Sequence, residues 1–170
     1  MSDARSLDNI KSDLASDVQQ IMTRYPTCRS AIMPALDLAQ QRYGGVDGTT
    51  YQAVAELLDV PEIWVFEVAS FYSLYDRTTT GRHHLRLCTN LSCMLRGSDA
   101  LMRHLQERLN VKPGETSDDG AITLSAVECL GACEVAPVLM ADTQYHGDLT
   151  VEKLDVLLAT LTEQVVEEMT

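Results

Sequence analysis

The stretches Cys88-Thr-Asn-Leu-Ser-Cys93 and Cys129-Leu-Gly-Ala-Cys133 hold four of the five cysteines in this 170-residue chain. Four residues separate the cysteines of the first pair, and three separate those of the second. No other part of the sequence gathers metal-binding side chains so closely. Four thiols in two short-spaced pairs predict the ligand set of a single metal centre.

The cysteine spacing favours a 2Fe-2S cluster over a zinc ion. Such a cluster takes four thiolates, and plant-type ferredoxins have one pair with four intervening residues. Structural zinc sites most often have two residues between paired ligands, and neither pair here does. Small residues beside the thiols, among them Ser92 and Gly131, let the backbone curl and point N–H groups at an anionic cluster. Zinc stays open as the alternative at this point.

Other cysteine chemistry fits the sequence less well. Disulfides need an oxidising compartment, and we expect none because the chain opens without an apolar signal segment. A thioredoxin-type dithiol would show Cys-x-x-Cys, which the sequence lacks. A Rieske-type site would use two histidines, but four cysteines are already present, so we interpret the histidines as surface residues: His83, His84, His104 and His146. Cys28 is interpreted as a small core residue.

The composition is that of an acidic globular protein. Hydrophobic residues make up 45% and charged residues 22%, with a formal net charge of −12. Without a basic stripe to neutralise phosphates, nucleic acid and anionic membrane surfaces are poor partners. No apolar run reaches membrane-spanning length, so direct membrane insertion is not expected. We expect a bacterial-type cytoplasmic protein whose contact with any membrane is made through partners.

The hydrophobic pattern changes near residue 80 and predicts two domains, 1–80 and 81–170. Apolar residues at three- and four-residue steps predict helices over 7–24, 30–43 and 62–71, with another between the last two that Thr49 or Thr50 would cap. The short turns between these helices favour an antiparallel bundle. For the last helix we expect burial of Ile63, Phe66, Val68 and Ala69. We interpret the neighbouring aromatic residues as core or inter-domain packing: Trp64, Phe66, Phe71, Tyr72 and Tyr75.

The second domain alternates strands and helices. Strands are predicted over 83–87, 121–127, 138–141 and 144–146, with helices over 98–109 and from Thr150 onward. Each cysteine pair follows the end of a strand, which is where α/β folds place their ligands. The fold class is therefore α+β, with helices packed on a small sheet.

Several motifs of the chain resemble one known family. They are Ala31-Ile-Met-Pro-Ala-Leu-Asp-Leu-Ala-Gln-Gln-Arg-Tyr-Gly44, Val68-Ala-Ser-Phe-Tyr72 and both cysteine motifs, the second followed by Ala136-Pro137. Together they resemble the NuoE family, the thioredoxin-like 2Fe-2S subunit of the NADH dehydrogenase module of respiratory complex I. The similarity extends over about residues 25–161.

The resemblance implies an N-terminal antiparallel helical bundle followed by a thioredoxin-like 2Fe-2S ferredoxin domain, with Cys88, Cys93, Cys129 and Cys133 as the four cluster ligands. It also implies that the single 2Fe-2S cluster exchanges electrons with the FMN of a partner subunit of NADH:quinone oxidoreductase. That partner would bind NADH and FMN, and further subunits would form the peripheral arm on the cytoplasmic side of the inner membrane.

Hydride chemistry is expected on the partner, because this chain has no Gly-x-Gly-x-x-Gly fingerprint and would not be catalytic alone. Two alternatives stay open. One is the small subunit of an NAD-linked hydrogenase or formate dehydrogenase, and the other is a zinc-bound interaction module.

Overall fold

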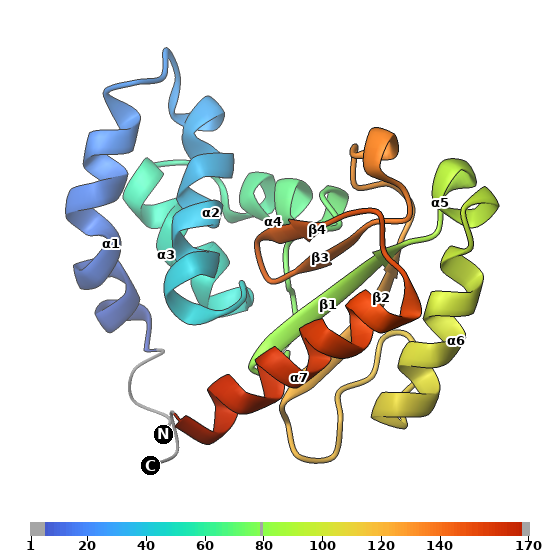
Figure 1. The fold of residues 1–170 in the computed structure, drawn as a ribbon. Helices are drawn as coiled ribbons and strands as arrows, with labels where there is room; N and C mark the ends of the chain where they lie inside the picture. The colour runs from blue at the N-terminus through green and yellow to red at the C-terminus, as the bar shows by residue number, and fades with distance from the viewer. Residues whose placement is uncertain (1–5, 79, 168–170) are drawn as a thin grey trace. The chain divides into compact units, whose positions relative to one another are not determined.

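The computed structural model describes residues 6–78 and 80–167 and divides into two compact units, residues 1–79 and 80–170 (Figure 1). Each unit has a buried apolar core of its own. The expectation of no signal segment rests on residues 1–5 in part, which lie outside the described residues. No helix in the described part of the chain is long and apolar enough to cross a membrane.

The first unit is a bundle of helices. Its elements are α1 (Leu7–Met22), the 3-10 turn η1 (Cys28–Ala31), α2 (Ile32–Tyr43), α3 (Gly48–Leu58) and α4 (Glu62–Phe71). α1 turns Ile10, Leu14 and Val18 into the core at four-residue steps, as its periodicity predicted. α2 is ended by Gly44, whose φ of 70° lies in the left-handed region that glycine adopts without a steric cost.

Three sequence predictions for this unit were wrong. α3 is capped by Asp47, whose side chain accepts a hydrogen bond from the Thr50 N–H at 3.0 Å, so the helix begins before either threonine. On α4, Ala69 is buried as predicted, but Ile63 is 56% exposed and Val65 is buried in its place. Cys28 is half-buried and does not belong to the core.

The aromatic residues around α4 do not form one core cluster. Tyr75 is buried, and its hydroxyl donates to an Asp37 carboxylate oxygen at 2.9 Å. Phe71 is 80% exposed, and Phe66 and Tyr72 are exposed as well. A helix that is apolar on nearly every side gives no period from which its buried face can be predicted, which explains why burial was wrongly expected for Ile63 and Phe66.

The second unit contains a four-stranded mixed sheet. Its elements are β1 (His83–Cys88), α5 (Leu91–Leu95), α6 (Ser98–Leu109), β2 (Ile122–Val127), the 3-10 turn η2 (Cys133–Val135), β3 (Leu139–Ala141), β4 (Gln144–His146) and α7 (Val151–Glu167). The strand order is β2-β1-β3-β4, with β1 parallel to β2 and the other neighbouring pairs antiparallel. The α+β fold class is confirmed.

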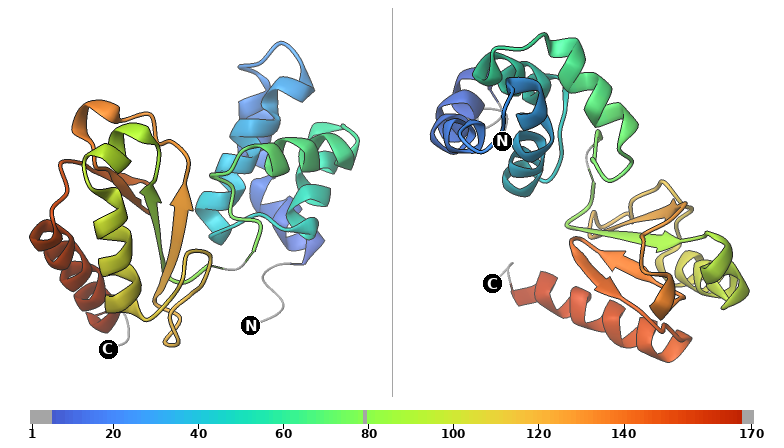
Figure 2. Two further views of the ribbon diagram at one scale, coloured as in Figure 1. Left: turned by 90° about the vertical axis from the view of Figure 1, so that its right-hand side faces the viewer. Right: turned by 90° about the horizontal axis from the view of Figure 1, so that it is seen from above.

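The core of this unit lies between α6, α7 and one face of the sheet (Figure 2). Leu85 and Leu87 of β1 both point into it, as expected for residues two apart on a strand. Leu105 of α6 and Leu154 of α7 meet them there, and both are fully buried. This packing fixes the strands whose ends lead into the two cysteine loops.

Candidate metal centre

Both cysteine loops leave the same edge of the sheet. β1 ends at Cys88 and β2 ends at Val127, two residues before Cys129. The parallel pairing of the two strands places Cys88 directly opposite Val127. The carboxyl ends of adjacent parallel strands are a usual position for a ligand site. Strand pairing therefore fixes the first residue of each loop, where the loop leaves its strand; we call this the inner end of the loop.

The first cysteine loop contains a short helix that the sequence analysis missed. Asn90 accepts a hydrogen bond from the Leu91 N–H at 2.7 Å through its side chain and starts α5. Cys93 lies within α5 and is 1% exposed, and Cys88 is 2% exposed. Both thiols belong to a small apolar cluster whose other buried members are Leu130, Ala136, Val138 and Met140.

The second cysteine loop is more open. Cys129 and Cys133 are both exposed, in contrast to the first pair. Gly131 has a φ of 72°, and its N–H points back to the Cys129 sulfur at 3.3 Å. An N–H donor to a sulfur stabilises the thiolate form and tunes a cluster bound to it. The Ala136–Pro137 peptide bond that follows η2 is cis.

Electrostatic effects link three of the four thiols. Burial raises the pKa of the Cys93 thiol, and its hydrogen bond with Cys88 raises the pKa further. The charges of Cys88 and Cys133 act in the same direction, so thiols from both loops lie within electrostatic reach of one another. All five cysteines are free thiols.

The four thiols do not form a closed metal site in the structure. Within residues 6–78 and 80–167, no three cysteine, histidine, aspartate or glutamate side chains are grouped so that they could hold a metal ion. The donor set nevertheless fits a 2Fe-2S cluster, which needs four thiolates and nearby N–H donors, because four free cysteines and the Gly131 amide are present in the two loops. The assignment of all four as ligands stays a prediction.

Two of the histidines pair with carboxylates away from the cysteine loops and are less exposed than predicted. His83 Nδ1 lies 2.8 Å from an Asp142 carboxylate oxygen, and its side chain is 17% exposed. His104 Nε2 of α6 lies 2.8 Å from an Asp155 carboxylate oxygen of α7, with 22% exposure. These residues are thus partly buried in the fold and are not surface residues as we expected.

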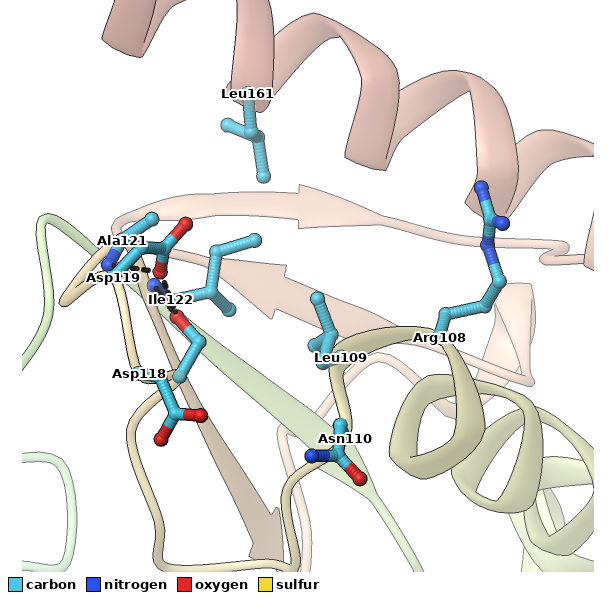
Figure 3. Close-up of a pocket in the computed structure, with 9 residues that line it drawn as sticks. Arg108, Leu109, Asn110, Asp118, Asp119, Ala121, Ile122 and Leu161 are labelled. Carbon is cyan, nitrogen blue, oxygen red and sulfur yellow. Dashed lines mark hydrogen bonds between the residues drawn. The ribbon is translucent and has the colours of Figure 1, made fainter.

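A hollow of about 290 Å³ lies at the opposite edge of the sheet, where β2 begins (Figure 3). Its lining residues are Arg108, Leu109, Asn110, Ser117, Asp118, Asp119, Ala121, Ile122 and Leu161, none of which is a cysteine or histidine. The Asp119 carboxylate accepts hydrogen bonds from the Ser117 hydroxyl at 2.6 Å and from the Ala121 N–H at 2.9 Å. The hollow is therefore separate from the cysteine loops.

A family model described as thioredoxin-like [2Fe-2S] ferredoxin matches residues 18–162. The chain belongs to this family. The E 2 subunit of the NADH-quinone oxidoreductase of Rhizobium meliloti (strain 1021) is 50% identical over 145 residues, which cover 85% of this chain and 86% of that protein. The corresponding E subunit from Rickettsia felis is 40% identical over 161 residues, covering 93% and 95% of the two chains. Recognition of the NuoE family from the sequence is thereby confirmed.

Among solved structures, this chain is similar in fold to a chain of an NAD+-reducing [NiFe]-hydrogenase in the air-oxidised state. The TM-score is 0.65 at 20% sequence identity, and the match covers 77% of this chain and 23% of the hydrogenase chain. The likeness supports the thioredoxin-like fold.

The residues that support the second loop from outside were not predictable from the sequence. Arg96 donates from Nε to the Ala136 carbonyl oxygen at 3.2 Å, and the Asp148 N–H donates to the Val135 carbonyl oxygen at 2.6 Å. Gly147 lies against Val135 so closely that an added Cβ would be 2.6 Å from the valine Cβ. These contacts join residues distant in the sequence, and the only local signal was the glycine itself.

Proposed function

We propose that this chain is an electron-transfer subunit of NADH:quinone oxidoreductase. In this proposal it binds one 2Fe-2S cluster through Cys88, Cys93, Cys129 and Cys133. One observation above all supports it: a chain of the thioredoxin-like [2Fe-2S] ferredoxin family has four free thiols in two loops at one edge of its sheet. The names of its relatives, which are subunits of NADH-quinone oxidoreductases, support the choice of complex.

The protein's own part is to hold the cluster and shield one side of it. A bound cluster supplies transfer of one electron at a time. The apolar cluster around Cys88 and Cys93 keeps water from the inner thiols. The outer thiols, Cys129 and Cys133, lie on the exposed side with Glu128 and Glu134 next to them, and these carboxylates favour a lower reduction potential.

We propose that the partner which binds FMN and NADH docks beside the cysteine loops. α5 exposes three large apolar side chains around the buried Cys93: Leu91 at 61%, Met94 at 44% and Leu95 at 74%. Apolar side chains grouped at a surface favour contact with another protein. Electron transfer requires a short distance, and a partner seated on α5 would come close to the thiols.

The same proposal gives the roles of the two domains, the further partners and the location of the chain. Residues 81–170 would form the cluster domain and residues 1–80 a separate helical domain, with other subunits of the peripheral arm as further partners. The complex would hold the chain at the cytoplasmic side of the inner membrane. The chain alone would not oxidise NADH, because hydride chemistry belongs to the flavin-binding partner.

Two other functions would use the same loops. The likeness to an NAD+-reducing hydrogenase favours, as second candidate, the small 2Fe-2S subunit of an NAD-linked hydrogenase or formate dehydrogenase. In a zinc-bound interaction module, the thiolates would only join the two loops.

Metal and sulfide analysis with low-temperature EPR tests the proposal on anaerobically purified full-length chain. We expect about two irons and two sulfides per chain, with a paramagnetic signal only after reduction by dithionite. One zinc, no visible colour and no cluster after attempted reconstitution would contradict it. Co-purification with a flavin-containing NADH dehydrogenase or with a hydrogenase would separate the two electron-transfer candidates.

A further inference from the structure

The guanidinium of Arg96 connects the two cysteine loops. Arg96 follows α5, three residues after Cys93, and its Nε donates to the Ala136 carbonyl oxygen at 3.2 Å. Ala136 is three residues after Cys133 and directly follows η2. This hydrogen bond therefore runs from just beyond the last cysteine of the first loop to just beyond the last cysteine of the second.

The acceptor of this bond lies in a packed environment, although the donor faces solvent. Ala136 is 4% exposed and belongs to the same apolar cluster as Cys88 and Cys93. The Arg96 side chain is 64% exposed. A buried carbonyl that loses its partner is costly to leave unsatisfied, so the bond contributes more than the exposure of the arginine alone suggests.

Asp148 also contacts the end of η2 and the Arg96 guanidinium. Its N–H donates to the Val135 carbonyl oxygen at 2.6 Å, and its carboxylate lies 3.7 Å from Arg96 Nη2. Because both side chains are more than half exposed, the ion pair itself stabilises little, and it serves mainly to orient the guanidinium. The end of η2 is thus held by a side chain from the first loop and by a backbone amide from the turn after β4.

We propose that Arg96 is a positioning residue for the metal centre: its guanidinium fixes the outer end of the Cys129–Cys133 loop relative to Cys93 and so slows loss of the cluster. The inner ends of the loops are already fixed by pairing of β1 with β2. Without Arg96, the outer end of the loop with the exposed thiols would keep only the Asp148 N–H bond and the packing of Gly147 against Val135, so it would move more freely. The expected effect on iron release rests on the proposed cluster, whereas the expected effect on motion of the Cys129–Cys133 loop does not.

Arg96→Met and Arg108→Met form a matched pair of variants. Arg108 lies on α6, is 62% exposed, and its Nε lies 3.6 Å from Asp155 of α7 in a contact that involves neither cysteine loop. Arg96→Lys keeps the charge but cannot present the planar fork of donors. All variants are made in the full-length chain and studied as purified, with whatever metal the chain contains.

Hydrogen exchange at the Val135 and Ala136 amides reports on the loop directly. We expect exchange to accelerate about tenfold in Arg96→Met, as for loss of one hydrogen bond that involves a charged group, and not at all in Arg108→Met. Equal exchange in the two variants would overturn the proposal, and so would full rescue by Arg96→Lys. This readout is independent of iron, so it is valid even if the chain proves to bind zinc.

Iron release into a chelator and the reduction potential then test the link to the cluster. We expect Arg96→Met to release iron about tenfold faster than Arg108→Met and to have the more negative potential, because it loses a nearby positive charge. Faster exchange of the loop without any difference in release or potential would overturn the positioning role. A wild-type chain with no iron and sulfide would instead reject the proposed function, so metal and sulfide content is measured first.

Discussion

Replacing Gly147 with alanine is expected to destabilise the α+β unit by about 2–4 kcal/mol, the combined cost of overpacking and a weakened hydrogen bond. The added Cβ would lie 2.6 Å from both Cβ and Cγ2 of Val135 and 2.9 Å from its carbonyl oxygen. Favourable carbon contacts begin near 3.5 Å, so the two segments must separate by about 1 Å.

The neighbouring backbone resists this movement. The Val135 carbonyl oxygen accepts the Asp148 N–H at 2.6 Å, so moving the valine weakens that bond. Gly147 does not have a positive φ, and alanine could adopt its backbone conformation. The cost is therefore steric, and it falls on η2, the turn that begins at Cys133.

Urea unfolding followed by hydrogen exchange and mass spectrometry measures the effect, because peptides from each unit are observed separately. We expect the α+β peptides of Gly147→Ala to unfold at lower urea concentration and the helical peptides to be unchanged. Gly48→Ala is the control: no atom lies within 4 Å of its added Cβ, and such a change typically stabilises by up to about 1 kcal/mol. If the α+β peptides of Gly147→Ala unfold at the same urea concentration as those of the wild type, the close packing is refuted.

Three further predictions concern the thiols and the helical unit. Cys129→Ser is expected to lose most bound iron because the ligand set becomes incomplete, whereas Cys28→Ser should keep wild-type iron and sulfide content. Tyr75→Phe removes a hydroxyl that donates to a carboxylate of α2 at 2.9 Å and should lower the free energy of unfolding in urea by about 1–2 kcal/mol. Hydrogen bonds from the Tyr43 hydroxyl and from an arginine hold the pKa of Asp13 below its usual value, so their stabilisation is complete above about pH 4 and disappears as pH falls through the folded-state pKa. Thermal melts of Asp13→Asn over the acid range should show a smaller loss of stability than those of the wild type.

Much of the fold was predictable because local chemistry determines it. Helix α1 follows from apolar residues at regular steps, and α2 ends where Gly44 adopts a left-handed conformation. Pro61 precedes α4, whose bounds agree with the prediction. The strands that lead into the cysteines were predicted as well, and β1 extends one residue beyond its predicted end, to Cys88.

Features that depend on distant contacts or on very short elements were not predictable. α5 has five residues, too few for any helical period to be recognised, and Asn90 was its only local signal. Which side of α4 is buried depends on the rest of the bundle, since apolar residues occur on nearly all its sides. Arg96 and Ala136 are 40 residues apart, so their hydrogen bond exists only once the sheet has formed.

The two cysteine loops are therefore supported in two different ways. Their inner ends follow from β1 and β2, whose hydrophobic pattern also builds the core, so a change there affects folding and the thiols together. Their outer ends depend on single contacts of Arg96, Gly147 and Asp148 with residues just after Cys133. Because these contacts lie outside the proposed ligand set, weakening one should change how long a cluster is held, whereas removing a thiol should change whether it binds at all. Release rate and iron content are thus independent readouts of the two kinds of support.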